Sequence, residues 1–376
     1  MKHQQCNVLI LTGSIGSGHI SVARAIAEAL ECTGKKNVRV EIVDFIASME
    51  NFVTATTKKI YLGSLKLSPK IWQLIFAGSS VSEWPLKILN MISAPFLQEK
   101  FLDLMRKKKP TVLVSTFPVW DILIKKTWKD YSGGRLPFIS VITDSISVHN
   151  AWTIGDPDYF IVANDDTKIA LKNLGIAEKR IRTFGYPVSK LFSMRVPSEK
   201  FKRRLGLSAN KKTLLLILSV GINWAKTKKI IDIILHSKLK DLQLIVINCA
   251  EEKWMSKLKK IEWPWPTHIT GWTNAMHSYI HASDIILTKA GGATVMECIA
   301  SQRPMIIVEA IPGQEIGNAM LVQKYNLGMI LENDMLNFDN AVQYILDHDA
   351  LIKRNLAAQQ KPNAACDIAN FLIGLS

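Results

Sequence analysis

The chain carries two successive series of short apolar segments separated by helix-like segments, and this alternation limits its fold more than any other feature. Apolar runs of this length, bounded by turn residues, are typical of strands buried in a parallel sheet. Strands that alternate with helices indicate βαβ units. The fold class is therefore α/β, with two successive open α/β halves and a cleft between them, outside the carboxyl ends of the strands. The first series comprises NVLILT, VRVEIVDF, TVLVSTFP, FISVITD and DYFIVAN, and the second comprises TLLLILSV, LQLIVINC, DIILTKAG and PMIIVEA.

The boundary between the two halves falls in a polar stretch. A chain of 376 residues is longer than one ordinary domain. The basic segment RVPSEKFKRRLGLSANKK separates the two series, so we expect the boundary near residues 187–197. The expected domains are 1–190 and 191–354, followed by a helix-like C-terminal segment, 355–376.

The charge and the cysteines restrict the class of protein. The net charge of +15 suits nucleic acid, an anionic membrane or an anionic substrate. The five cysteines are dispersed and form no CxxC pair, so we expect neither a disulfide framework nor a structural zinc site, and a cytoplasmic location. The N-terminal run VLILT indicates a core strand rather than a signal peptide, and the sequence has no uncharged apolar run of about 20 residues that would span a membrane.

A glycine-rich turn joins the first strand to a helix in LTGSIGSGHISVARAIAEAL. The spacing of Gly13, Gly16 and Gly18 does not match GxGxxG, and His19 stands where an NTP-binding loop has lysine, so a dehydrogenase and an NTPase are disfavoured. Glycines let the backbone approach a ligand, and the N–H groups at a helix start favour anions or polar oxygens. The helix dipole disfavours a charged imidazole there, so a neutral His19 can take a proton from a hydroxyl. The structural alternative is a histidine that only binds a loop carbonyl.

A second glycine turn lies in DIILTKAGGATVMECIASQRPMIIVEAIPGQEIGN. Gly291, Gly292 and Ala293 offer backbone N–H groups at a helix start and Thr294 adds a hydroxyl, so this turn suits a diphosphate. Glu297, one turn into the helix, suits hydrogen bonds from two ribose hydroxyls. The simpler explanation of Glu297 is a solvated acid that the helix dipole favours.

The loop PGQEIGN places three polar side chains where another helix begins. Gln314, Glu315 and Asn318 suit hydrogen bonds to sugar hydroxyls. A capped helix start is the structural alternative.

These motifs together resemble those of the GT-B glycosyltransferases of the monogalactosyldiacylglycerol synthase and processive diacylglycerol glucosyltransferase family, which is related to the MurG group of family 28. The likeness is strongest in the glycine turn that ends in histidine and in the block from KAG to GQE..GN. It runs through LILTGSIGSGH, TDSISVHNAW, DYFIVAN, TFGYPV, GWTNAM, KAGGATVMECIASQRPMIIVEAIPGQEIGN and KPNAA.

The resemblance implies two Rossmann-like domains, with a UDP-sugar in the C-terminal domain and a lipid acceptor in the N-terminal domain. It also implies that the last helix returns to the N-terminal domain. It implies that residues 291–294 and Glu297 hold diphosphate and ribose, that Gln314 and Glu315 meet the sugar, and that the loop at Trp272 meets uracil. The sequence departs from the family where Gly292-Ala293 replaces Pro-Gly, and where SVGINWAK keeps one glycine of a multi-glycine loop. The ligand-binding residues that we expect are Gly16, Gly18, Gly221, Trp272, Thr273, Gly291, Gly292, Ala293, Thr294, Glu297, Gln314, Glu315 and Asn318.

The expected reaction is transfer of a hexose from UDP-glucose or UDP-galactose to the hydroxyl of a diacylglycerol-type lipid, with inversion. The glycine turn and the helix dipole stabilise the leaving UDP, so no metal or other cofactor is obligatory. His19 takes the acceptor proton, a contribution of about 10²–10⁴-fold. Asp144 and His149, in TDSISVHNAW, match a family pattern at the cleft, and Asp144 either orients a histidine or is itself the base. We expect the Asp156-Pro157-Asp158 sequence to form a turn rather than a metal site.

Residues 54–109 combine basic and apolar side chains. Ten basic and three acidic residues give this segment a net charge of +7, and Trp72 and Trp84 lie among its aliphatic residues. Such a composition is typical of a surface that lies on anionic lipid, so we expect peripheral attachment to the inner face of the cell membrane. The alternative is that the apolar side chains pack on the sheet while the lysines are solvated.

Three other functions fit parts of the sequence. The first is a MurG-like transferase that acts on a lipid-linked cell-wall precursor, and the second is a UDP-sugar epimerase, which needs no membrane-binding segment. The third is a nucleic-acid binder. The basic residues lie among aliphatic ones rather than in a groove-reading motif, so nucleic acid is not an expected partner.

Overall fold

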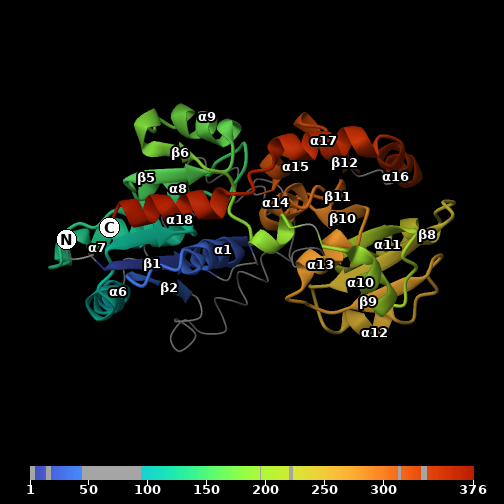
Figure 1. Ribbon diagram of the computed structural model, residues 1–376, viewed down its shortest axis with the longest axis horizontal. Coiled ribbons are helices and arrows are strands. Elements are labelled where there is room, and N and C mark those ends of the chain that lie inside the picture. Colours follow the sequence, from blue (N-terminus) through green and yellow to red (C-terminus); the bar gives the residue numbers. More distant parts are fainter. Residues whose placement is uncertain are drawn as a thin grey trace. The chain divides into compact units, whose positions relative to one another are not determined.

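The computed structural model describes residues 5–13, 18–44, 95–194, 196–219, 223–311, 315–331 and 337–376. These residues form two compact units (Figure 1). One contains the N-terminal part up to Ser189 together with Lys361–Ser376, and the other contains Lys190–Gln360. Each unit is built on a six-stranded sheet of parallel strands with interleaved helices, which confirms the α/β class with two Rossmann-like halves.

The first unit has the strand order β2-β1-β3-β4-β5-β6. Its inner strands form because their side chains are apolar on both faces: β1 and β3 are almost entirely buried. The strands are β1 (Cys6–Thr12), β2 (Val38–Asp44), β3 (Val112–Ser115), β4 (Phe138–Val141), β5 (Tyr159–Val162) and β6 (Ile181–Thr183). The helices are α1 (Gly18–Cys32), α6 (Pro95–Lys108), α7 (Pro118–Thr127), α8 (Ala151–Ile154), α9 (Asp165–Asn173) and α18 (Ala364–Gly374), with short 3₁₀ turns at Trp128–Asp130 and Glu178–Arg180.

The last helix of the chain belongs to the first unit. Helix α1 buries Val22, Ile26 and Leu30 at helical spacing, and α18 packs against α1 (Figure 1). The chain enters α18 close to Gly185, whose φ is +108° and where an added Cβ would lie 2.5 Å from the Cβ of Lys361. Only glycine satisfies both conditions, so Gly185 lets the return segment dock.

The second unit has the strand order β12-β11-β10-β7-β8-β9. Its central strands β7 and β8 are also buried along nearly their whole length. The strands are β7 (Lys212–Leu218), β8 (Leu242–Asn248), β9 (Thr267–Thr270), β10 (Ile285–Lys289), β11 (Met305–Glu309) and β12 (Gly328–Ile330). The helices are α10 (Ser198–Arg204), α11 (Trp224–Leu235), α12 (Trp254–Leu258), α13 (Met276–His281), α14 (Gly292–Ala300), α15 (Ile316–Lys324), α16 (Phe338–Asp347) and α17 (Asp349–Gln359), with a 3₁₀ turn at Lys190–Phe192.

Each sheet has one topological switch point. In the first unit the chain leaves β1 for β2 on one side and later returns to β3 on the other; in the second unit the same holds for β7, with β8 and β10 on its two sides. Parallel strands end at one edge of the sheet, and ligands of such folds bind outside that edge at the switch point. The described ranges include no helix long and apolar enough to cross a bilayer.

Candidate functional site

His19 lies at the switch point of the first unit, in the first turn of α1. Its Nδ1 is 2.7 Å from the carbonyl oxygen of Thr116, which follows β3, and 3.2 Å from Oγ1 of Thr143, which follows β4. A carbonyl oxygen only accepts hydrogen bonds, so Nδ1 carries the proton of the neutral ring and Nε2 keeps its lone pair. Within the described residues, no hydrogen bond reaches Nε2. The ring is therefore fixed in the tautomer that a general base requires.

Aromatic side chains enclose the His19 ring. The Phe117 ring meets it edge to face at a centroid distance of 5.0 Å, and the Trp152 ring lies at 6.3 Å. Gly13 permits this closure, because an added Cβ at residue 13 would lie 2.9 Å from Cδ1 of Phe117. Burial lowers the pKa of His19 to about 4, although the hydrogen bond to Thr116 opposes the shift. At neutral pH the ring is uncharged and able to accept a proton.

Asp144 and His149 lie beside Trp152. Oδ2 of Asp144 accepts hydrogen bonds from Nε1 of Trp152 at 2.9 Å and from the backbone N–H of His149 at 3.4 Å. Nδ1 of His149 accepts from the N–H of Ala151 at 3.1 Å, so a neutral His149 carries its proton on Nε2. Burial raises the pKa of Asp144 to about 6 and lowers the pKa of His149. Asp144 thus holds the Trp152 side chain in place. The neutral His149 ring can donate a hydrogen bond from Nε2.

A buried carboxyl group that the sequence pattern does not single out lies in α7 of the same unit. Asp121 of α7 is fully buried, and its Oδ2 accepts from Oγ of Ser140 in β4 at 2.7 Å. Burial raises the pKa of Asp121 to about 7. Ser115, at the end of β3, donates from Oγ to the carbonyl oxygen of Phe117 at 2.9 Å and so shapes the loop that holds His19.

The second glycine turn lies at the switch point of the second unit. Gly291 is the N-cap of α14 and has φ −68° and ψ 129°, and no side chain caps this helix. The first helical hydrogen bond runs from the N–H of Val295 to the carbonyl of Gly291 at 3.0 Å. The N–H groups of Gly292, Ala293 and Thr294 therefore have no backbone partner in the described part of the chain, as expected at a helix start. This cluster of amides attracts an anion.

Glu297 is in the second turn of the same helix. Burial raises the pKa of its carboxyl group to about 8, so the group is mostly protonated at pH 7. Burial, and then the Glu297 carboxylate, raise the pKa of the Cys249 thiol to about 11. Glu297 is therefore close enough to Cys249, which directly follows β8, to interact with it electrostatically.

Glu315 and Asn318 are bound within the unit. Oε1 of Glu315 is 2.5 Å from Nζ of Lys289, and Oε2 accepts from the N–H of Ile311 at 3.0 Å. Nδ2 of Asn318 donates to the carbonyl oxygen of Ala290 at 3.0 Å. Both side chains are buried, so here they shape the glycine turn.

Trp272 and Thr273 lie on the loop that leaves β9. The Trp272 side chain is exposed, and Oγ1 of Thr273 accepts from the N–H of Ala275 at 3.0 Å. This loop begins at the same edge of the sheet as the glycine turn, because all six strands are parallel. An exposed indole at this edge is available to a planar ligand.

Several expected residues lie outside the described ranges, namely Gly16, Gly221, Gln314 and residues 54–94 of the basic segment. Gly18 is described and is the first residue of α1. In the described end of the basic segment, Phe101, Leu102 and Met105 are buried, whereas Arg106 and Lys108 form ion pairs with acidic side chains. This part follows the structural alternative, with apolar side chains packed and basic ones at the surface.

The Asp156-Pro157-Asp158 sequence forms a turn fixed by arginines. Asp156 has φ +54° and lies 2.5 Å from Nη2 of Arg180, and Asp158 lies 2.8 Å from Nη2 of Arg135. Both carboxylates are thus used within the unit. The described residues bring no group of three metal-binding side chains together.

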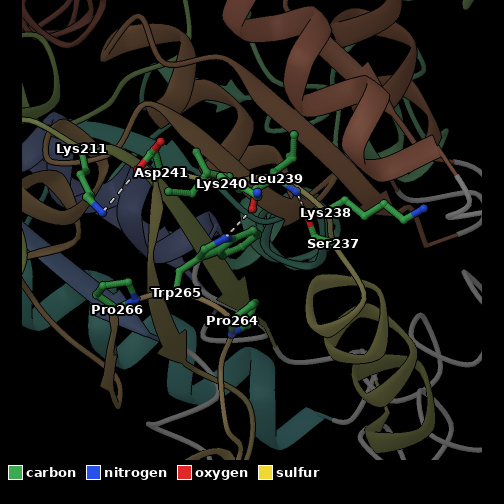
Figure 2. A pocket seen from close by; sticks show the side chains of 10 residues that line it. Lys211, Ser237, Lys238, Leu239, Lys240, Asp241, Pro264, Trp265 and Pro266 are labelled. Atoms are coloured by element: carbon green, nitrogen blue, oxygen red, sulfur yellow. Dashed lines mark hydrogen bonds and ion pairs between the residues drawn. The ribbon is translucent and has the colours of Figure 1, made fainter.

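A hollow of about 540 Å³ lies at the opposite edge of the second sheet (Figure 2). It is formed where β7 and β8 begin, so it is separate from the switch point. Its lining residues are Lys211, Ser237, Lys238, Leu239, Lys240, Asp241, Leu242, Pro264, Trp265 and Pro266.

Two family profiles match successive parts of the chain. The monogalactosyldiacylglycerol (MGDG) synthase profile matches residues 19–188. The profile of the glycosyltransferase family 28 C-terminal domain matches residues 223–371. The chain is 25% identical over 370 residues to a processive diacylglycerol beta-glucosyltransferase of Bacillus cereus, a match that covers 97% of this chain and 93% of that protein.

Solved structures share the fold at low sequence identity. MurG of Acinetobacter baumannii superposes with a TM-score of 0.60 and 11% identity, over 98% of this chain and 99% of that one. The UDP-GlcNAc 2-epimerase of Neisseria meningitidis, bound to UDP-GlcNAc, superposes with a TM-score of 0.61 and 13% identity, over 98% of this chain and all of that one. A lipopolysaccharide outer core galactosyltransferase and a UDP-GlcNAc 2-epimerase both share this architecture, so the fold alone does not distinguish the two activities.

Proposed function

We propose that this glycosyltransferase, which belongs to the monogalactosyldiacylglycerol synthase family and has a family 28 C-terminal domain, moves a hexose from a UDP-sugar to the hydroxyl of a diacylglycerol-type lipid with inversion. The observation that carries the proposal is the neutral His19 ring, whose Nδ1 proton is bound by Thr116 and whose Nε2 has a lone pair. Such a nitrogen accepts the proton of an attacking alcohol.

In this proposal the second unit binds the donor. The amides of Gly292, Ala293 and Thr294, together with Gly291, surround the diphosphate, and Glu297 binds the ribose. Trp272 and Thr273 lie against uracil. The other residues that we propose to contact the donor or to shape the loops around it are Gly16, Gly18, Gly221, Gln314, Glu315 and Asn318. We further propose that the first unit is the acceptor domain and the second is the donor domain, with a boundary near residue 190.

The proposed reaction is a single displacement. The acceptor O–H gives its proton to Nε2 of His19 while its oxygen attacks the anomeric carbon. The bond from that carbon to the β-phosphate oxygen breaks, and the electron pair leaves with UDP. The amides at the start of α14 stabilise the growing negative charge. The Thr116 carbonyl stabilises the imidazolium that forms, so the Nδ1–H bond strengthens as the reaction proceeds.

Asp144 and His149 have supporting roles in this scheme. Asp144 holds Trp152 against the His19 ring through the 2.9 Å bond to the indole. The Nε2–H of a neutral His149 is suited to donate a hydrogen bond to substrate oxygens. His19 is then the base of the three.

The acceptor and the membrane contact are part of the same proposal. The chain's relatives in Bacillus are named for diacylglycerol, which supports a glycerolipid acceptor. We propose that residues 54–109 hold the enzyme on the anionic inner face of the cell membrane. The donor is UDP-glucose or UDP-galactose.

The test is a transfer assay with radiolabelled UDP-glucose and UDP-galactose in parallel, on vesicles of anionic lipid that contain diacylglycerol. We expect labelled glycolipid from one donor. His19→Ala should lower the turnover by about 10²–10⁴-fold, whereas His236→Ala, which removes an exposed histidine of the second unit, should leave it unchanged. Isomerised sugar nucleotide without labelled lipid would favour an epimerase and end the proposal.

A further inference from the structure

A partly exposed ion pair lies beside the proposed donor turn. Nζ of Lys226, in the first turn of α11, is 2.7 Å from both carboxylate oxygens of Glu309, the last residue of β11. The backbone carbonyl of Glu309 accepts from the N–H of Ala290 at 2.8 Å, directly before Gly291. The ammonium of Lys226 therefore binds the side chain of Glu309, and the backbone of Glu309 is hydrogen-bonded to Ala290 at the start of the glycine turn.

The strand order brings this ammonium to the switch point. Helix α11 follows β7, and β10 lies between β7 and β11 in the sheet. A side chain that begins after β7 and ends on Glu309 of β11 must reach across the carboxyl end of β10. The glycine turn leaves β10 at that end, so Lys226 spans the crevice in which ligands of this fold bind.

A second ion pair at the same turn provides a comparison. Lys289 and Glu309 are register partners on β10 and β11, and Lys289 is paired with Glu315. The side chains of Lys289 and Glu315 are only 15% and 9% exposed, whereas those of Lys226 and Glu309 are 38% and 20% exposed. The Lys289 pair is closed within the protein. The Lys226 pair is open to solvent, where an ion pair contributes only about 0–1 kcal/mol and a new anion can replace the carboxylate.

We propose that Lys226 is a donor-binding residue: its ammonium exchanges the Glu309 carboxylate for the diphosphate of the UDP-sugar and stabilises the departing UDP. Glu309 holds the ammonium at the crevice until the donor arrives. The inference rests on the proposed function, because it assigns the anion at this turn to a sugar nucleotide. Lysine suits the task, since its compact charge on a flexible stem binds phosphate oxygens without a fixed geometry.

The test compares UDP with uridine by calorimetry on the whole protein. Lys226→Met should weaken UDP binding by about 10- to 100-fold, the usual effect of a lost charge-assisted hydrogen bond, and should leave uridine binding unchanged. Lys229→Met, three residues along the same helix and exposed, is the matched control and should bind UDP as the wild type does.

Glu309→Gln separates this role from a structural one. It breaks the same ion pair but releases the ammonium and removes a competing anion, so it should bind UDP as tightly as the wild type or more tightly. A purely structural pair predicts weaker binding in both variants, and that result would overturn the inference, as would unchanged UDP binding by Lys226→Met. If the wild type binds no UDP, the proposed function itself fails. If the wild type binds UDP and Lys226→Met binds it equally well, only the inference about Lys226 fails.

Discussion

Replacing His19 with glutamine should remove a defined part of the pH dependence of folding. The pKa of His19 is lowered from 6.5 to about 4 by burial, so the folded protein favours the neutral ring. The unfolded chain binds a proton near pH 6.5 and the folded protein does not bind it until about pH 4. The contribution of His19 to stability is therefore complete above pH 6.5 and is lost as the pH falls through this window.

The size of the effect follows from the same two values. A difference between 6.5 and about 4 corresponds to about 3 kcal/mol in full. Between pH 7 and pH 4.5 the wild type should lose about 2.5 kcal/mol of unfolding free energy through His19 alone. Glutamine cannot titrate, so His19→Gln should lack this loss.

Guanidinium unfolding of the wild type and of His19→Gln at pH 7, 5.5 and 4.5 measures this loss of unfolding free energy. The difference between the two proteins cancels the other groups, including Asp144 and Asp121, whose raised pKa values act in the opposite direction on acidification. Parallel pH dependence in wild type and His19→Gln would refute the lowered pKa of His19.

Three further predictions concern other groups. Because Glu297 is protonated at pH 7 and two ribose hydroxyls favour its ionised form, UDP binding should release about one proton there, measured by calorimetry in two buffers; the same release from Glu297→Gln would contradict the ribose role. Burial raises the pKa of Asp121 to about 7, so this group should lower stability by about 1.4 kcal/mol per pH unit as the pH rises from 4 to 7. An unchanged slope in Asp121→Asn would argue against this. Gly185→Ala should lower the unfolding free energy by about 1–3 kcal/mol, because φ is +108° and the new Cβ meets Lys361. Gly134→Ala, with φ +79° and open space around it, should cost less, and equal costs would exclude the steric explanation.

The fold was largely predictable because buried parallel strands have an unbroken apolar pattern. The segments NVLILT and TLLLILSV correspond to β1 and β7, which are inner strands of the two sheets. Three strands had no such signal, namely β6, β9 and β12, which are three or four residues long and lie at sheet edges. Their sequences, IRT, THIT and GMI, contain no apolar run of strand length, so the pattern does not distinguish them from loops.

The site was only partly predictable, because local patterns do not specify which loops meet. The glycine turn before His19 is a local feature, and the sequence identifies it. The contacts of His19 with Thr116 and Thr143 depend on the strand order, which places β3 next to β1 and β4 next to β3 in the sheet. Likewise, the pairing of Lys226 with Glu309 joins residues 83 positions apart.

The most direct test of the central claim combines product analysis with one variant. The wild type, given its UDP-α-hexose and diacylglycerol, should form a glycolipid with a β-glycosidic linkage, which the NMR signal of the anomeric proton reports. His19→Ala should still bind UDP but form almost no glycolipid. An α-linked product, or a His19→Ala variant that transfers sugar at the wild-type rate, would contradict a single displacement assisted by His19.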